Sequence, residues 1–391
     1  MTKPPRIYFD NAATTPVSEK ALAAMLPYFR ENFGNPSAIH HYGTEANKVV
    51  EERRKQVAKN IGAISSEIFF TSGGTESDNW AISHALAVNG RKGRHLVSTA
   101  IEHNAVLKPL ERLEGSGWKA TLIKPDEYGQ ITPEQLEEAI RPDTVLVSVI
   151  MASNVIGTIL NIRELCATAH RHGVLFHTDA VQAAGHIPID VRQLGVDLLS
   201  ISAHKFQGPK GAGALFSKIP RVPVPLILGG GQEKGARSGT ENVPGVVGLS
   251  QALTEAVENM DQNSKRLTDL RDQLIASTLR IPGTYLTGHP TNRLPGHASF
   301  VIEGLAHGAH LINELNEAGI CASSGSACSA SSREASGVLS ALGLNEQLAM
   351  AALRLSLSPE NTEEEVETVA KALARLIPKV RDLTKNNRYS H

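Results

Sequence analysis

The chain has 391 residues, of which 41% are hydrophobic and 20% are charged, and its formal net charge is -1 at pH 7. A chain of this length exceeds what one hydrophobic core usually organises, so we expect two domains. The near-neutral charge provides no basic field of the kind that binds nucleic acid or an anionic membrane surface. The predicted partners are therefore small molecules and other proteins.

The cysteine count and the N-terminal segment predict the cellular compartment. Cys166, Cys321 and Cys328 are too few for a disulfide framework, and their odd number leaves at least one thiol free, which favours a reducing compartment. The first residues contain no apolar stretch of the signal type, and no run approaches the roughly 18 apolar residues that span a bilayer. We therefore expect a soluble, cytoplasmic protein.

Short apolar runs alternate with helical patterns from about residue 67 to residue 216. This alternation predicts a mostly parallel sheet covered by helices, in an α/β domain. One of the helical patterns lies at residues 163–170. The predicted strands are residues 67–71, 95–99, 144–149, 174–178, 196–201 and 213–216.

The C-terminal part of the chain has a different pattern, which predicts a second, smaller domain. Helical periodicity runs from about residue 245 to about residue 279, a short strand is predicted at residues 298–302, and a last helix at about residues 363–383. Residues 323–332 around Cys328 are rich in Ser, Gly and Ala. Taken alone, such a stretch is usually a flexible connector.

A Gly-Gly turn at residues 71–79 (TSGGTESDN) follows a predicted strand and leads into a helical segment. Glycines let the backbone approach an anion closely, and the start of a helix offers N–H groups without internal partners, so a phosphate could bind here. A Gly-Gly turn before a helix is more often plain structure. The turn alone therefore leaves both interpretations open.

Asp179 and Lys205 follow two successive predicted strands, at a spacing compatible with one βαβ step. An acid at the carboxyl end of a parallel strand lies where such folds bind their ligands. A lysine there can form a Schiff base, because burial beside a cofactor lowers its pKa. The plain alternatives are a helix cap for Asp179 and a surface position for Lys205. Together with the Gly-Gly turn, the two residues match the needs of pyridoxal 5'-phosphate (PLP): a phosphate anchor, an acid for the pyridine nitrogen and an amine for the aldehyde.

At this point the chain resembles a known family, the cysteine desulfurases of the class V aminotransferases, which are fold-type I PLP enzymes. The resemblance covers nearly the whole chain, and two of its segments indicate the type that serves iron-sulfur cluster assembly and nitrogen fixation: residues 237–244 (RSGTENVP) and 324–328 (SGSAC). The other matching segments are residues 8–16 (YFDNAATTP), 33–37 (FGNPS), 72–77 (SGGTES), 102–104 (EHN), 203–205 (AHK), 229–233 (GGGQE) and 353–356 (LRLS).

The resemblance implies a division of the chain and an assembly. A large PLP-binding domain is expected over residues 16–260, with helices on both faces of a mostly parallel sheet. A smaller α+β domain is expected over residues 1–15 and 261–391, and it would carry the catalytic cysteine loop at about residues 322–335. The resemblance further implies a homodimer with shared active sites.

The resemblance also implies the contacts of the cofactor and the substrate. PLP would form an aldimine with Lys205. The implied phosphate contacts are Gly74, Thr75, Ser202, His204 and, from the neighbouring subunit, Thr240. The implied ring contacts are His103, which stacks on the ring and handles protons, Asp179 at the ring nitrogen, and Gln182 and Asn154 on the hydroxyl side. Arg354 would clamp the substrate carboxylate, helped by Asn11, because a guanidinium can make two parallel hydrogen bonds.

The implied reaction converts L-cysteine to L-alanine. Lys205 would remove the Cα proton, and after a PLP ketimine has formed, the thiolate of Cys328 would take the sulfur as a persulfide. The sulfur would then pass to an acceptor protein such as an iron-sulfur scaffold. We expect no resident metal site, and the sequence leaves open whether Cys328 transiently ligates an iron-sulfur cluster.

Three rival interpretations remain open at the level of sequence. The first is an aminotransferase or lyase on the same fold that uses Lys205 and Asp179 but not Cys328. The second is selenocysteine as a substrate, and the third is a non-catalytic scaffold that has kept the fold. For single residues, the plain alternatives are an inert thiol at Cys328 and a structural role for His103, whereas Cys166 and Cys321 are expected to be packing residues.

The chain departs from the family pattern at three places, which leaves the sulfur acceptor open. Ser153 and Val155 stand where this type usually has asparagine and glutamate, and Ser358 stands in place of a glycine. Residues 329–336 also differ from the usual sequence after the cysteine.

Overall fold

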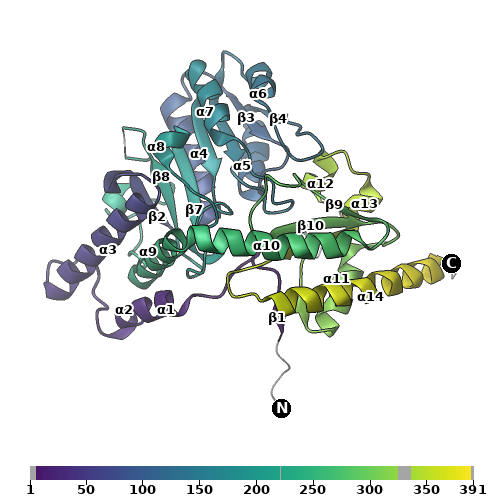
Figure 1. Cartoon of the computed structure of the whole chain (residues 1–391). Coiled ribbons are helices and arrows are strands. Elements are labelled where there is room, and N and C mark those ends of the chain that lie inside the picture. Colours follow the sequence, from purple (N-terminus) through teal and green to yellow (C-terminus); the bar gives the residue numbers. More distant parts are fainter. Residues whose placement is uncertain (1–5, 221, 325–335, 389–391) are drawn as a thin grey trace.

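The computed structural model describes residues 6–220, 222–324 and 336–388, so Cys328 lies outside the described residues. Its centre is a seven-stranded sheet with the order β2-β8-β7-β6-β5-β3-β4 (Figure 1). Neighbouring strands run parallel except at β8, which is antiparallel to both β2 and β7. The strands are β2 (Ile68–Thr71), β3 (His95–Thr99), β4 (Lys119–Ile123), β5 (Thr144–Ile150), β6 (Leu175–Asp179), β7 (Leu198–Ser202) and β8 (Gly213–Ser217).

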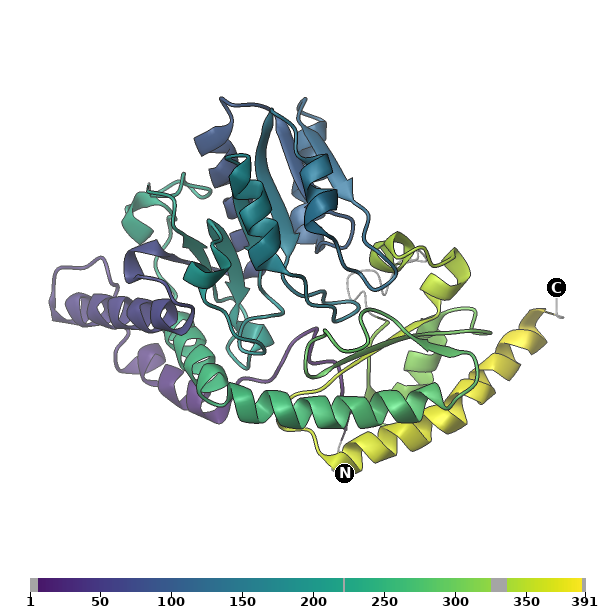
Figure 2. The ribbon, with the colours of Figure 1, turned by 45° about the horizontal axis from the view of Figure 1, so that its top comes forward.

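The large sheet carries helices on both faces, as expected. Side chains of successive strand residues point to opposite faces. Val147 of β5 packs in one apolar cluster with Leu165 of helix α7, whereas its neighbour Leu146 packs in another with Trp80 of helix α4. Figure 2 shows the sheet between these layers. The helices of this part are α1 (Glu19–Met25), α2 (Pro27–Arg30), α3 (His41–Asn60), α4 (Gly74–Asn89), α5 (Asn104–Glu114), α6 (Pro133–Ala139), α7 (Ile162–Arg171), α8 (Val191–Leu194) and α9 (Val243–Glu258).

A second, antiparallel sheet has the order β12-β10-β9 and packs on long helices (Figure 2). Its apolar core joins Phe9 near the N-terminus to side chains between Leu267 and Val380. The elements of this part are α10 (Met260–Leu279), β9 (Thr284–Leu286), β10 (His297–Ile302), α11 (Gly308–Glu317), α12 (Gly337–Ala341), α13 (Glu346–Met350), β12 (Ala352–Ser356) and α14 (Glu363–Arg388), with β1 (Ile7–Tyr8) paired in parallel to β11 (Ile320–Cys321).

The helical stretch predicted at residues 245–279 is two helices. Helix α9 ends and α10 begins at Asn259, whose side-chain amide donates to the Glu255 carbonyl at 2.7 Å and so caps the end of α9. The expected domain boundary at residues 260–261 stays a prediction, although it lies next to this break. None of the helices in the described ranges combines the length with the apolar character that crossing a bilayer requires.

Candidate active site

A cavity of about 260 Å³ lies at the carboxyl ends of the parallel strands. Strand β5 contributes Ile150, β6 contributes Asp179 and β7 contributes Ser202, while helix α4 presents its first turn. Ligands of open α/β sheets bind at this edge, because the loops that follow neighbouring strands meet there. The lining residues are Gly74, Thr75, Asp78, His103, Ile150, Asn154, Asp179, Val181, Gln182, Ser202, His204 and Lys205.

The start of α4 is shaped to hold an anion. Gly74 and Thr75 form the first turn of this 16-residue helix, whose N–H groups and dipole favour negative charge. A Cβ atom at Gly74 would lie 2.5 Å from Val181 Cγ2, so any other residue here would force Val181 to shift. Ser202, at the end of β7, lines the same cavity. These residues fit the phosphate group of PLP.

Asp179 ends strand β6 and is 4% exposed. Its Oδ1 accepts a hydrogen bond from the Val181 N–H at 2.9 Å. Burial raises the pKa of the Asp179 carboxyl, and the nearby His103 and Lys205 oppose this rise. A buried carboxyl of this kind fits the pyridine nitrogen of PLP, because the protonated nitrogen would supply the missing opposite charge.

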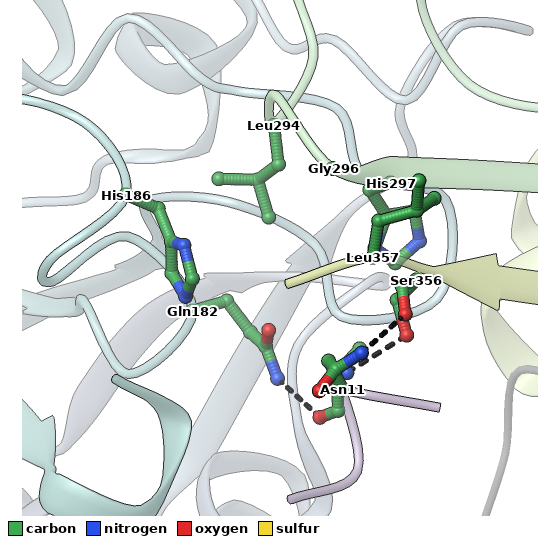
Figure 3. A pocket seen from close by; sticks show the side chains of 9 residues that line it. Asn11, Gln182, His186, Leu294, Gly296, His297, Ser356 and Leu357 are labelled. Carbon is green, nitrogen blue, oxygen red and sulfur yellow. Dashed lines mark hydrogen bonds between the residues drawn. The ribbon is translucent and has the colours of Figure 1, made fainter. Parts of the chain in front are cut away.

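Lys205 follows β7 in a short 3-10 turn, at the same cavity as Asp179. Its Nζ donates to the carbonyl oxygens of Ala12 and Ala13 at 2.6 and 2.8 Å. Gln182 Nε2 also donates to the Ala12 carbonyl, at 2.9 Å (Figure 3). The N-terminal segment therefore closes one side of the site next to the predicted Schiff-base lysine.

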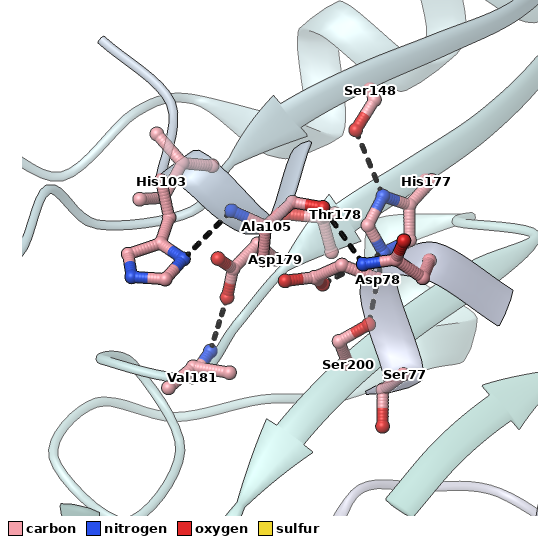
Figure 4. Close-up of polar contacts among 12 residues, drawn as sticks. Ser77, Asp78, His103, Ala105, Ser148, His177, Thr178, Asp179, Val181 and Ser200 are labelled. Carbon is pink, nitrogen blue, oxygen red and sulfur yellow. Dashed lines mark hydrogen bonds and ion pairs between the residues drawn. The ribbon is translucent and has the colours of Figure 1, made fainter. Parts of the chain in front are cut away.

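Two histidines of the cavity are held by different contacts. His103 caps α5, because its Nδ1 accepts the Ala105 N–H at 3.1 Å (Figure 4), so in the neutral ring the proton sits on Nε2. His204 lies 3.1 Å from Thr14 Oγ1 through its Nδ1. Burial, followed by the charges of Lys205 and another lysine, lowers the pKa of His204 to about 4, so its ring is neutral near pH 7. A structural cap and a proton-handling role are both compatible with this placement of His103.

Arg354 lies on β12 and is 1% exposed. Its Nη2 is 2.7 Å from Asp10 Oδ1, and its Nη1 donates to the Asn154 carbonyl at 2.8 Å. The guanidinium thus connects the N-terminal segment, the small sheet and the loop that carries Asn154. Neither Arg354 nor Asn11 lines the 260 Å³ cavity. Asn11 lies in an adjoining cavity of about 30 Å³, which it shares with Gln182 (Figure 3).

The remaining predicted residues do not join this cavity. Thr240 is exposed and is not among the lining residues, so its predicted role in a neighbouring subunit stays a prediction. Cys328 lies outside the described residues. Ser323, near the start of the predicted cysteine loop, pairs with the backbone of Arg354 in both directions, at 3.2 and 2.6 Å. This pairing places the start of that loop beside the predicted substrate arginine.

Three of the residues that depart from the family pattern, Ser153, Val155 and Ser358, are buried, whereas residues 329–335 lie outside the described residues. The Ser153 hydroxyl accepts the N–H groups of Val155 and Ile156 at 3.3 and 3.4 Å, and Val155 is 4% exposed in the apolar core. The Ser358 N–H donates to Asn361 Oδ1 at 2.8 Å. Since these side chains are buried, they form part of the fold and not of a surface that a partner would contact.

Three buried polar residues, of which Asp78 lines the cavity, had no predicted role. His177 lies between Ser148 and Ser200 at 2.9 and 3.0 Å, and its Nε2 is 3.6 Å from Asp78 Oδ1 (Figure 4). Burial lowers the pKa of His177 to about 3, so it is neutral, and burial and Asp179 raise the pKa of Asp78. The third is Glu102, directly before His103. The sequence signal for His177 was a polar residue inside an apolar strand, whereas Asp78 and Glu102 lie in the quoted segments at residues 71–79 and 102–104, where no role was assigned to them.

Comparisons with known proteins identify the family of the chain. The family Aminotransferase class-V matches residues 7–369. A cysteine desulfurase IscS of Methanosarcina thermophila is 47% identical over 378 residues, which cover 97% of this chain and 93% of that protein. A solved NifS-like protein superposes with a TM-score of 0.90 at 38% identity, covering 96% of this chain and all of that one.

A second solved structure, described as SspA in complex with cysteine, has a TM-score of 0.80 at 35% identity and covers 91% of this chain and all of that one. The fold of these neighbours confirms the expected fold class, a mostly parallel sheet with helices on both faces and a smaller α+β part. The chain belongs to the class-V aminotransferase family, among its cysteine desulfurases.

Proposed function

We propose that this chain converts L-cysteine to L-alanine with PLP bound to Lys205, and that Cys328 carries the sulfur to acceptor proteins. The observation that carries the proposal is the single cavity that brings together an anion-binding helix start, the buried acid Asp179 and Lys205. When bound, PLP supplies an electron sink that stabilises the negative charge left on Cα after a proton is removed.

The residues of the cavity would divide the work of binding and orientation. Gly74, Thr75, Ser202 and His204 would hold the phosphate, and the neutral His204 ring would donate one N–H to it. Asp179 would pair with the ring nitrogen, since its buried carboxylate needs a positive partner. Asn154 and Gln182 lie on the cavity wall, where they could contact the hydroxyl side of the ring.

The proton steps would fall to Lys205 and His103. The Lys205 amine lines the cavity and would remove the Cα proton. His103 Nε2 would hold or release a proton on the face of the ring, because its Nδ1 is occupied by the Ala105 N–H. Arg354 would bind the substrate carboxylate, and its placement on buried strand β12 keeps its orientation fixed.

Asp10 is expected to position Arg354 for the substrate. Replacing Asp10 with alanine removes the acidic partner of a buried guanidinium, so we expect the KM for L-cysteine to rise by about tenfold with a smaller change in kcat. Steady-state kinetics measure this split. The control is Glu367→Ala, which removes an exposed ion pair with Lys371 and should change neither constant. An unchanged KM in Asp10→Ala would show that Asp10 does not orient Arg354.

We also propose that two copies associate, with Thr240 entering the neighbouring site. Support comes from exposed apolar side chains in two segments, which a monomer would leave in water. They are Leu22, Leu26, Phe29, Phe33, Ile39 and Tyr42 in the first segment and Val222, Val224, Leu226, Ile227 and Leu228 in the second. Ile39 is 98% exposed.

Analytical ultracentrifugation should find a dimer, and Leu26→Asp with Phe29→Asp should give an inactive monomer. The same change at Leu279, which is 43% exposed on α10, is the control and should leave the dimer intact. A monomeric but fully active wild-type protein would contradict the shared site.

The acceptor of the sulfur would be a protein such as an iron-sulfur scaffold, in a reducing compartment such as the cytoplasm. A thiol that carries a persulfide needs such a compartment, because oxidation would consume it. Since the departures at Ser153 and Val155 are buried, they give no reason to expect a different acceptor surface there.

The function is tested with the purified wild-type protein, L-cysteine and a reductant, in the absence of any keto acid. We expect alanine to form and the protein to be yellow from bound PLP. An aminotransferase would need a keto acid to turn over, and a scaffold protein would form no alanine. The same assay with selenocysteine in place of L-cysteine tests whether selenocysteine is also a substrate.

A further inference from the structure

Glu102 connects two residues that are predicted to contact the cofactor, His103 and Asp179. It directly precedes His103, and its side chain is 3% exposed beneath the cavity. Its Oε1 accepts two hydrogen bonds, from the Thr99 hydroxyl at 2.7 Å and from the Ile150 N–H at 2.9 Å. The carboxyl therefore joins the turn after β3 to the last residue of β5.

The end of β5 is in turn paired with the end of β6. Ile150 and Asp179 are register partners in the parallel ladder, and the Met151 N–H donates to the Asp179 carbonyl at 2.8 Å. His103 is thus linked to Asp179 in three steps. A peptide bond joins His103 to Glu102, a hydrogen bond joins the Glu102 carboxyl to the Ile150 N–H, and Ile150 is the register partner of Asp179. A shift of the Glu102 carboxyl would move His103 relative to Asp179.

The surroundings of Glu102 favour a neutral carboxyl. Its Oε2 is buried and has no hydrogen-bond partner among the described residues. The charged groups that face it are acids, Asp179 on β6 and Asp78 on α4. A buried charge without a partner is far more costly than a neutral polar group. Burial accordingly raises the pKa of Glu102 to about 8, with a further rise from Asp179, against the lowering by its two hydrogen bonds.

We propose that Glu102 is a positioning residue of the active site: its neutral buried carboxyl ties the turn that carries His103 to the end of β5 and so fixes His103 relative to Asp179. The inference rests on the proposed function for its effect on catalysis. A carboxyl that only braces a turn would affect stability alone, whereas a positioning carboxyl also changes the cofactor environment and kcat.

The first test compares Glu102→Ala with Glu102→Gln. Alanine removes both accepted hydrogen bonds, so kcat for alanine formation should fall by on the order of tenfold to a hundredfold while KM changes little. The visible absorbance of the bound cofactor should shift as well. Glutamine keeps a neutral acceptor at Oε1, so it should recover most of the kcat and the wild-type spectrum. If glutamine is as impaired as alanine, or alanine is as active as wild type, the proposal is wrong.

A second test does not depend on catalysis. A carboxyl whose pKa is raised in the folded protein keeps its proton while the unfolded chain loses it, so wild-type stability should fall relative to Glu102→Gln as the pH rises from about 4.5 to about 8. Thermal unfolding of the apoproteins measures the difference. If the difference in stability between wild type and Glu102→Gln does not change with pH, the Glu102 carboxyl is not neutral in the folded protein. This result can be read even if wild type forms no alanine and the proposed function itself fails.

A third variant keeps the inference testable if Glu102→Ala does not fold. Thr99→Val removes one of the two donors to Glu102 and should lower kcat in the same direction by a smaller factor, with a shifted cofactor spectrum. The control is Thr168→Val, which removes another buried hydroxyl, bonded to Glu164 within α7, and should leave the spectrum unchanged. Equal spectra for the two variants would assign Glu102 a structural role only.

Discussion

Lys205→Ala is expected to abolish alanine formation from L-cysteine and the yellow colour of the purified protein. The substitution removes the amine that lines the cavity and that we assign to both cofactor attachment and Cα proton removal. A positioned base contributes roughly a hundredfold to ten-thousandfold on its own, so the loss should exceed that range when attachment is also lost. Alanine release and absorbance after gel filtration measure the two effects.

The matched control is Lys210→Ala, five positions along the same loop and exposed. It removes an equal charge near His204 without touching the cavity lining, so activity and colour should remain. Lys205→Ala also removes two hydrogen bonds to the carbonyls of Ala12 and Ala13, at about 1 kcal/mol each. A circular dichroism spectrum like that of wild type would show that the fold survives this loss. A yellow, active Lys205→Ala protein would refute the assignment.

The buried centre of the sheet could be predicted because its strands are apolar on both faces. Strands β5, β6 and β7 are buried along nearly their whole length and were each predicted within one or two residues. Strand β4 was missed because it lies at the edge of the sheet, where its side chains are largely exposed or half-buried and its sequence is mixed. Local pattern thus identifies strands that are covered on both sides.

The small sheet was harder to predict because its stabilising contacts are distant in sequence. Only β10 was predicted, whereas β9 and β12, its two partners, were not. Strand β12 contains Arg354, and a charged residue in a short segment suggests an exposed position and not a buried strand. Its burial depends on Asp10, which lies at the other end of the chain and could not be paired with it from spacing alone.

The candidate site shows the same limit. Asp179 and Lys205 could be placed together because they lie at or just beyond the ends of β6 and β7, and these parallel neighbours bring their carboxyl ends to the same edge. Gly74 follows β2, which pairs antiparallel with β8 at the edge of the sheet. Glu102 and Asp78 gave no such signal, since their roles come from what surrounds them in the fold. The burial of an acid beside other acids is a tertiary property, which no local pattern records.

Cys328→Ala is expected to lower alanine formation by a factor on the order of a thousand or more while the yellow colour remains, because the nucleophile is lost but the cofactor site is not. This combination separates Cys328 from Lys205, whose loss removes both. Alanine release under a reductant and the absorbance spectrum are the measurements. Alanine formation at the wild-type rate would favour the rival interpretation, a lyase or aminotransferase that does not use this thiol.

Cys166→Ala is the control for the loss of a thiol. Cys166 is 1% exposed, although its Sγ lies 3.8 Å from the His170 ring, which in turn is 2.8 Å from Asp197. The arrangement looks like that of an activated cysteine, but burial and the negative charge of Asp197 raise the pKa of Cys166 to about 12. The thiol is therefore protonated near pH 7 and is a poor nucleophile. Full activity in Cys166→Ala, together with its loss in Cys328→Ala, would assign sulfur transfer to Cys328 and not to the buried Cys166.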